Sequence, residues 1–66
     1  MADRRLQVFA TVARLLSFTK AAEALHMTQP AVTFQIRQLE DYFNTRLFDR
    51  THNRISLTSA GHLVKG

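Results

Sequence analysis

The sequence contains no cysteine, only two glycines and a single proline. Without cysteine, a disulfide framework and a cysteine-based zinc module are both excluded, so ordinary side-chain packing has to hold the fold. The scarcity of glycine and proline, with no low-complexity stretch, argues against a disordered chain. No apolar run approaches the roughly 18 residues of a membrane span, and none follows the first charges as in a signal peptide. We therefore expect a cytoplasmic protein.

At 66 residues the chain is long enough for one small domain, and 45% of its residues are hydrophobic. A domain of this size buries only about 60% of the surface that its unfolded chain exposes, so the core has to be economical. The bulky members of this hydrophobic set are the five phenylalanines, at positions 9, 18, 34, 43 and 48.

The charge balance is basic, with nine Lys and Arg against five Asp and Glu, a net charge of +4 and a pI near 10.8. Such a balance fits a nucleic-acid partner. The charges do not cluster, however: residues 1–27 hold four basic against two acidic side chains, and residues 28–66 five against three. Charge alone therefore fits a soluble, incidentally basic domain equally well.

Apolar spacing predicts two helices in the first part of the chain. The first has a stripe at spacings of three and four, and Asp3 can cap it. Its members are Leu6, Phe9, Val12 or Ala13, and Leu16. The second is short and rich in alanine, and it begins near Ser17 or Thr19 and ends at Leu25.

A third helix follows a break of about three residues at 26–28. Thr28 can act as its N-cap, and Pro30 falls in the first turn, where a missing N–H costs nothing. The helix is expected from Gln29 to Tyr42 or Phe43, with a turn at residues 44–45. Its apolar stripe consists of Val32, Ile36, Leu39 and Phe43.

After residue 45 the pattern changes to short segments that can alternate between two faces. Residues 47–50 and 55–57 are expected to be strands, joined by a four-residue polar connection at 51–54, which predicts a β-hairpin. Thr58 can then cap a fourth helix over residues 59–65. That helix has too few apolar residues to be a finished amphipathic element, so we expect it to be cut from a longer protein.

Two short helices joined by a three-residue turn form a helix-turn-helix pattern. Small Ala22 allows the helices to cross closely, Leu25 and Met27 fill the turn, and Val32 and Ile36 anchor the second helix. We therefore predict a mainly α fold with a small β-hairpin, a winged helix-turn-helix with a three-helix core. The outward residues of the third helix are then Gln29, Pro30, Thr33, Phe34, Arg37 and Gln38.

These outward side chains suit the major groove of DNA, which admits an α-helix. Gln29 can pair with adenine, the Thr33 methyl can rest on a thymine methyl, and Arg37 can reach guanine or phosphate. The free N–H groups at the helix start suit a phosphate. For Phe34 two interpretations stay open: contact with a thymine methyl or sugar, or packing against the wing or the second helix.

Two ordered blocks of residues resemble the LysR-type transcriptional regulators. The first runs from Ser17-Phe18 through Ala21-Ala22, Leu25 and Thr28–Thr33 to Ile36 and Leu39-Glu40. The second is Leu47–Arg50 followed by Leu57–Gly61. Together they cover essentially the whole chain in register, so the resemblance is specific.

The resemblance implies that the third helix is the recognition helix and that the hairpin is a wing on the backbone or minor groove. It implies a DNA-binding domain at 1–58, with the helix-turn-helix at about 18–43 and the wing at about 47–57. It also implies that residues 59–66 are the start of a truncated linker helix. A small-molecule effector would bind a further domain absent here. The parent would be a homodimer or homotetramer on an interrupted palindrome of double-stranded DNA, and the isolated domain a monomer or weak dimer. The expected DNA-binding residues are Thr28, Gln29, Pro30, Thr33, Phe34, Arg37, Arg50, Thr51, Asn53 and Arg54.

Some positions depart from the family pattern or have another explanation. Thr33 replaces the commoner serine, and Asn53 stands where a basic residue is frequent, so the minor-groove contact can pass to Arg54. Arg50 can instead pair with Glu40 or Asp41.

Enzymatic function is not expected. The three histidines share no spacing suited to a metal, and there is no convincing acid/base pair or nucleophile, so neither a metal nor a cofactor is expected. Two other classes remain as alternatives. One is a different winged-helix protein that binds protein or nonspecific nucleic acid, and the other is a cationic amphipathic membrane binder.

Overall fold

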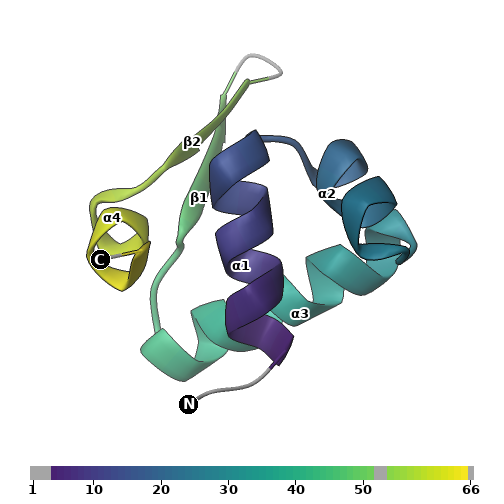
Figure 1. The fold of residues 1–66 in the computed structure, drawn as a ribbon. Helices are drawn as coiled ribbons and strands as arrows, with labels where there is room; N and C mark the ends of the chain where they lie inside the picture. Colours follow the sequence, from purple (N-terminus) through teal and green to yellow (C-terminus); the bar gives the residue numbers. More distant parts are fainter. Residues whose placement is uncertain (1–3, 52–53, 66) are drawn as a thin grey trace.

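The structure is a computed structural model that describes residues 4–51 and 54–65, and its element order is the one the sequence predicts (Figure 1). The four helices are α1 (Arg4–Leu15), α2 (Phe18–Leu25), α3 (Gln29–Phe43) and α4 (Ser59–Lys65). The two strands are β1 (Phe48–Thr51) and β2 (Arg54–Leu57). No helix in the described part of the chain is long and apolar enough to cross a membrane.

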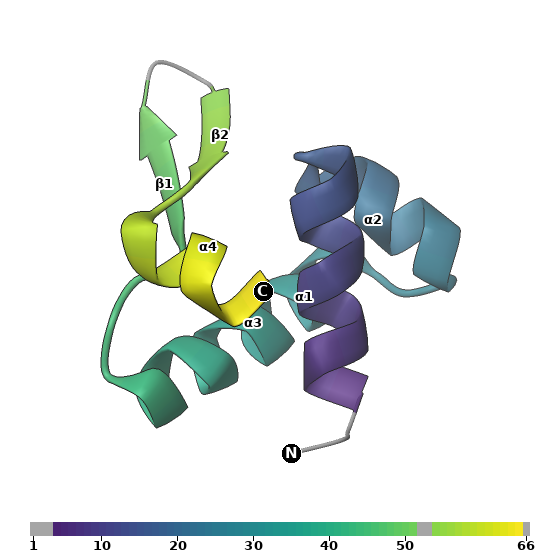
Figure 2. The ribbon, with the colours of Figure 1, turned by 60° about the vertical axis from the view of Figure 1, so that its left-hand side comes forward.

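Helices α1, α2 and α3 pack against one another, and the hairpin stands upright beside them with α4 at its base (Figures 1 and 2). The expected seam is confirmed, because Val32, Ile36 and Leu39 of α3 are buried together with Phe9 of α1. The remaining core side chains come from α1, α2 and the start of the hairpin: Val8, Val12, Ala13, Phe18, Ala21, Ala22, Leu47 and Phe48.

The ends of the two helices of the helix-turn-helix are set by capping groups. The Ser17 hydroxyl accepts a hydrogen bond from the backbone N–H of Lys20 at 3.1 Å, and the Thr28 hydroxyl accepts one from that of Ala31 at 3.2 Å. These bonds satisfy N–H groups that have no partner inside the helix. At its other end α2 stops at His26, whose left-handed backbone (φ 55°) turns the chain toward α3. The turn that the sequence predicts at residues 26–28 is confirmed.

Two members of the expected apolar stripes lie outside the core. Leu16 follows the last residue of α1 in a left-handed conformation (φ 50°) and is 47% exposed. Because the helix has already ended, the side chain no longer continues the buried face. Phe43, the last residue of α3, is 39% exposed, because this helix extends beyond Leu39, its last buried residue. The proposed cap Asp3 lies outside the described residues.

The hairpin has a shorter loop than the sequence suggests. The strands pair in the antiparallel register Phe48 with Leu57, Arg50 with Ile55, and Thr51 with Arg54. The expected four-residue connection at 51–54 is therefore wrong, because its first and last residues pair and belong to the strands. Residues 52 and 53 lie between the strands and outside the described residues.

Two hydrogen bonds join Thr58, the residue before α4, to the segment that leads into β1, and a third caps the helix. The Thr58 N–H donates to the Leu47 carbonyl at 3.0 Å, and the Thr58 hydroxyl donates to the Arg46 carbonyl at 2.6 Å. The same hydroxyl accepts from the Gly61 N–H at 3.0 Å, which confirms Thr58 as the cap of α4. Gly61 is required here, because a Cβ would overlap the Leu47 carbonyl oxygen and the Leu57 side chain. This junction fixes α4 against the base of the hairpin.

Candidate nucleic-acid interface

The first two turns of α3 present an exposed face with groups that can contact bases. Gln29, Pro30, Phe34 and Arg37 are exposed and Thr33 is half-buried, and the five side chains line one shallow hollow. The spacing of four between residues 29, 33 and 37 places these side chains on one side of the helix. The structure thus brings together five of the side chains that the sequence predicts to contact DNA.

Phe34 is 60% exposed. Packing of its ring into the domain, against the wing or α2, is therefore excluded as the reason for a phenylalanine at this position. A large apolar side chain exposed beside polar neighbours is available to a partner.

A second hollow lies between the start of α2 and the hairpin, and we call it the wing cleft. It has a volume of about 740 Å³, and it is lined by Leu16, Ser17, Phe18, Thr19, Gln29, Arg50, Arg54 and Ile55. Gln29 lines both the wing cleft and the α3 hollow, so the two surfaces are continuous. Two arginines and two hydroxyl side chains make the wing cleft suitable for an anion.

Arg50 does not pair with a carboxylate in the described structure. Its guanidinium carbon lies 4.0 Å from the centre of the Phe18 ring. Glu40 instead accepts a hydrogen bond from the Leu47 backbone N–H at 2.9 Å through its Oε2. The alternative that Arg50 pairs with Glu40 or Asp41 is therefore wrong, and the guanidinium keeps its hydrogen-bond donors for another partner.

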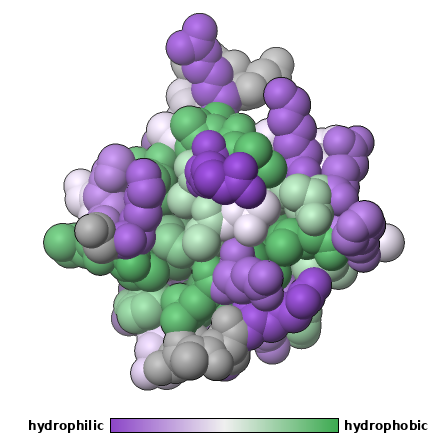
Figure 3. Space-filling model, viewed as in Figure 1, coloured by the Kyte–Doolittle hydropathy of each residue, from purple (hydrophilic) through white to green (hydrophobic). Residues whose placement is uncertain are grey.

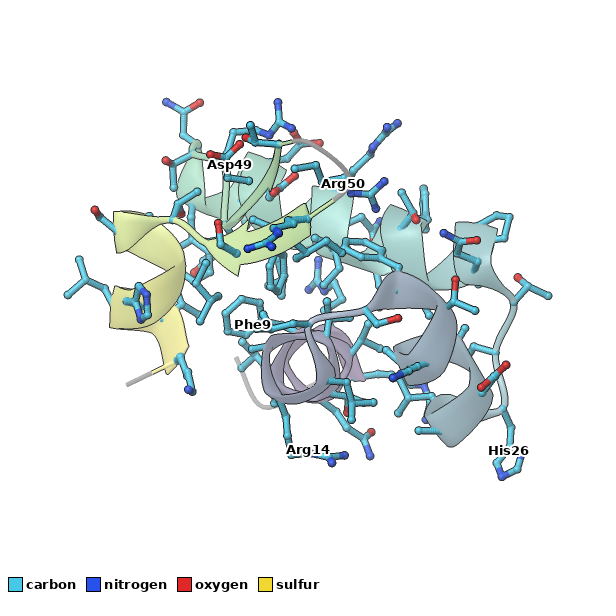
Figure 4. All side chains as sticks on the ribbon, turned by 90° about the horizontal axis from the view of Figure 1, so that it is seen from above. Phe9, Arg14, His26, Asp49 and Arg50 are labelled. Carbon is cyan, nitrogen blue, oxygen red and sulfur yellow. The ribbon has the colours of Figure 1, made fainter. Side chains whose placement is uncertain are left out.

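The neighbouring acidic residue of the hairpin points away from Arg50. Side chains alternate between the two faces of a strand, so Asp49 lies on the opposite face from Arg50, and Figure 4 labels both. The Thr51 hydroxyl donates a hydrogen bond to Asp49 Oδ1 at 3.3 Å. The Thr51 hydroxyl oxygen can still accept a hydrogen bond from a partner. Asn53, the other expected wing contact, lies outside the described residues.

Thr28 serves first as a helix cap and only then as a candidate contact. Its hydroxyl oxygen accepts from Ala31, but its hydroxyl hydrogen is not used in that bond.

Phe18 and the two hydroxyl residues beside it, Ser17 and Thr19, were not expected at the interface. The pair Ser17-Phe18 is part of the family pattern, yet nothing in the order of residues indicates that Arg50 lies over the Phe18 ring.

An apolar groove lies apart from this interface, where the end of α3 meets α4. It is lined by Leu6, Tyr42, Phe43, Thr45, Ala60, Leu63 and Val64. Leu63 is 82% exposed and Tyr42 65% exposed. Figure 3 shows hydrophobic surface over the α4 side of the molecule, next to hydrophilic side chains.

A three-helix core, a capped and exposed third helix and a hairpin beside its first turns define a winged helix-turn-helix domain. The model of the lysR family of bacterial regulatory helix-turn-helix proteins matches residues 4–62. The chain therefore belongs to the LysR family.

Individual relatives agree in sequence and in fold. The chain is 52% identical over 58 residues to the HTH-type transcriptional regulator CfxR of Cupriavidus necator, covering 88% of this chain and 18% of that protein. A LysR-family transcriptional regulator from Eggerthella lenta superposes with a TM-score of 0.94 at 42% identity, over 98% of this chain and 93% of that one. A DNA complex of the CbnR DBD superposes with a TM-score of 0.90 at 38% identity, over 98% and 75% of the two chains. The chain spans about a fifth of the length of the curated relatives it matches.

Proposed function

We propose that the chain binds double-stranded DNA in a sequence-specific manner, as the DNA-binding domain of a bacterial transcriptional regulator. The observation that carries the proposal is the continuous surface formed by the α3 hollow and the wing cleft. It combines base-reading side chains such as Gln29 with the cations Arg50 and Arg54. The similarity to a domain solved in complex with DNA supports it.

In this proposal the first turns of α3 enter the major groove. Gln29 reads a base edge, Thr33 contacts a thymine methyl, and Phe34 lies against a methyl group or a sugar. Arg37 reaches guanine or a phosphate, while Thr28 and Pro30 lie at the start of the helix nearest the backbone. The function is binding alone, without catalysis and without a metal or cofactor.

The wing supplies contacts that hold the duplex without selecting its sequence. Here phosphates or the minor groove are contacted by Arg50, Thr51, Asn53 and Arg54. Phosphate contacts set the position of the protein on DNA, whereas base contacts set the sequence preference.

The same proposal extends to the whole protein. Residues 1–58 form the DNA-binding domain and residues 59–66 begin a linker helix, with an effector-binding domain beyond it. The regulator acts in the cytoplasm as a homodimer or homotetramer on an interrupted palindrome, and a small molecule controls it. A two-fold DNA site fits a two-fold protein, because each recognition helix then occupies one half-site.

The test is selection of bound duplexes from a random pool, followed by competition at rising salt. A defined motif should emerge, and it should stay preferred over random duplex while nonspecific affinity falls. Binding that shows no motif and vanishes with salt would indicate a nonspecific winged-helix protein. Co-sedimentation with anionic vesicles in place of DNA binding would indicate a membrane binder.

A further inference from the structure

We propose that Phe18 is a positioning residue for DNA binding: its ring holds the guanidinium of Arg50 in place for a backbone phosphate. The inference rests on the proposed function, because it concerns how one of the wing cations is presented to DNA. The observation behind it is the stacking of Arg50 on the Phe18 ring, at 4.0 Å from the ring centre.

The Phe18 ring is itself held by a cluster of aromatic side chains. Phe18 is 5% exposed and meets the ring of Phe48 edge-on, with centroids 5.8 Å apart and planes at 74°. Phe48 in turn packs against Phe9, with centroids 5.4 Å apart. The cluster joins α1, α2 and β1, so the ring face under Arg50 belongs to the core rather than to a mobile surface side chain.

Stacking suits the task of binding a phosphate. The guanidinium is planar and its N–H groups point outward in that plane, so a ring against one face leaves these donors available. A cation over an aromatic face is also attracted by the ring quadrupole. An exposed arginine loses side-chain freedom when it binds a phosphate, and an arginine already held on a ring loses less.

The location of the pair also fits. Phe18 and Arg50 line the wing cleft together with Gln29 and Arg54. The same two residues line an adjoining small hollow that includes Thr33 and Arg37 of α3. Arg50 of the wing therefore lines the hollows between the hairpin and α3, where the DNA backbone has to pass if both contact the duplex.

The experiment is a double-mutant cycle with Phe18→Leu, Arg50→Gln and the double variant, measured on the selected duplex at several salt concentrations. Phe18→Leu should weaken binding about two- to fivefold, the range of an exposed cation–π contact. It should have little further effect in the Arg50→Gln background, because Phe18 acts through Arg50. Phe18→Tyr keeps an aromatic ring under Arg50 and should bind DNA as tightly as the wild type.

Phe9→Leu is the matched control. It removes an aromatic contact with Phe48, as Phe18→Leu does, but it leaves the ring under Arg50 in place. It should lower the melting temperature while DNA affinity of the folded protein stays unchanged. Equal losses of affinity for Phe9→Leu and Phe18→Leu, or additive losses in the cycle, would overturn the inference.

A measurement on the wild-type protein decides the matter even if Phe18→Leu does not fold. The Arg50 side-chain Nε–H should show the restricted motion of a held group in NMR relaxation, whereas that of exposed Arg14 should show free motion. Equal mobility of the two side chains in the free protein would refute the inference. Failure of the proposed function would look different, since the wild type would then select no DNA motif.

Discussion

Gln29 lines both the α3 hollow and the wing cleft. Its side-chain amide can distinguish one base from another, whereas an arginine that binds a phosphate cannot. Gln29→Ala should therefore weaken binding to the selected site by about 1–3 kcal/mol and relax the preference at one base position. Repeating the selection with the variant checks this. Gln7→Ala, an exposed glutamine on α1, is the control and should leave the motif intact. An unchanged motif for Gln29→Ala would mean that another side chain reads that base.

Arg54 is exposed at the start of β2 and lines the wing cleft. Arg54→Ala should weaken binding to all sequences alike, because a phosphate contact carries no sequence information. The slope of log affinity against log salt should fall by about 0.9, the value for one phosphate. Arg14→Ala removes the same charge from a side chain that projects from the helical side, away from the hairpin (Figure 4), and should leave the slope nearly unchanged. A sequence preference that relaxes at one base position in Arg54→Ala would assign Arg54 to base contact.

At the scale of single elements, α3 has one face in the core and another in the interface. Ile36 is 2% exposed, and Ile36→Ala should cost about 2–5 kcal/mol, because it leaves a cavity where the helices meet. That approaches the whole stability of so small a domain. Phe34→Ala on the exposed face should change the melting temperature little. Thermal melts of both variants test the assignment, and an Ile36→Ala melt that overlays the wild type would contradict it.

The junction between the hairpin and α4 depends on a residue without a side chain. Gly61→Ala would push a methyl group into the Leu47 carbonyl oxygen, which is backbone and cannot rotate away. We expect a destabilisation of about 1–3 kcal/mol, the usual cost of overpacking. Exposed Ser59→Ala in the same helix is the control. Hydrogen exchange of the Thr58 amide, which donates to Leu47, should rise in Gly61→Ala and stay slow in the control.

The helices of the fold were predictable because their signals are local. Thr28 as cap, Pro30 in the first turn and the spacing of Val32, Ile36 and Leu39 lie within one segment and agree with one another. Leu16 and Phe43 belong to apolar stripes with the same spacing, yet both side chains are exposed. The spacing of apolar residues predicts which side of a helix a side chain lies on. At the end of a helix, however, no other element packs against that side to cover it.

The α3 part of the site was predictable for the same reason, since residues on one face of one helix share a periodicity. The wing was less so. The loop was expected to be longer, because polar Thr51 and Arg54 resemble turn residues while in fact they pair across the hairpin. The contact of Arg50 with Phe18 joins residues far apart in the chain, and no spacing encodes it.

At the scale of the whole molecule, the length of α4 bears on assembly. Helix α4 has seven residues, about two turns, which is too short for a self-standing coiled-coil seam. A polypeptide limited to residues 1–66 should therefore be a monomer or a weak dimer in solution. Its affinity per domain for a half-site and for the full palindrome should be similar, because it lacks the gain from tethering, which reaches about 10²–10⁴.

Sedimentation of the free protein and titration of both duplexes measure this. A tight dimer without DNA would contradict the prediction. The apolar groove would then be the first surface to test, with Leu63→Lys, because Leu63 is its most exposed large side chain. A palindrome bound far more tightly per domain than a half-site would likewise show cooperation between the two copies.

Tyr42 gives this groove an optical label of its own. It is the single tyrosine in a chain without tryptophan, it is 65% exposed, and its ring meets that of Phe43 edge-on at 5.1 Å. It lies 13 residues after Gln29 on α3, which is about 20 Å along the helix. Intrinsic fluorescence of the protein therefore comes from the groove rather than from the proposed DNA-binding surface. Binding of a half-site should leave the emission nearly constant, whereas burial of the groove in a dimer should change it, so the two events can be followed separately without an added dye.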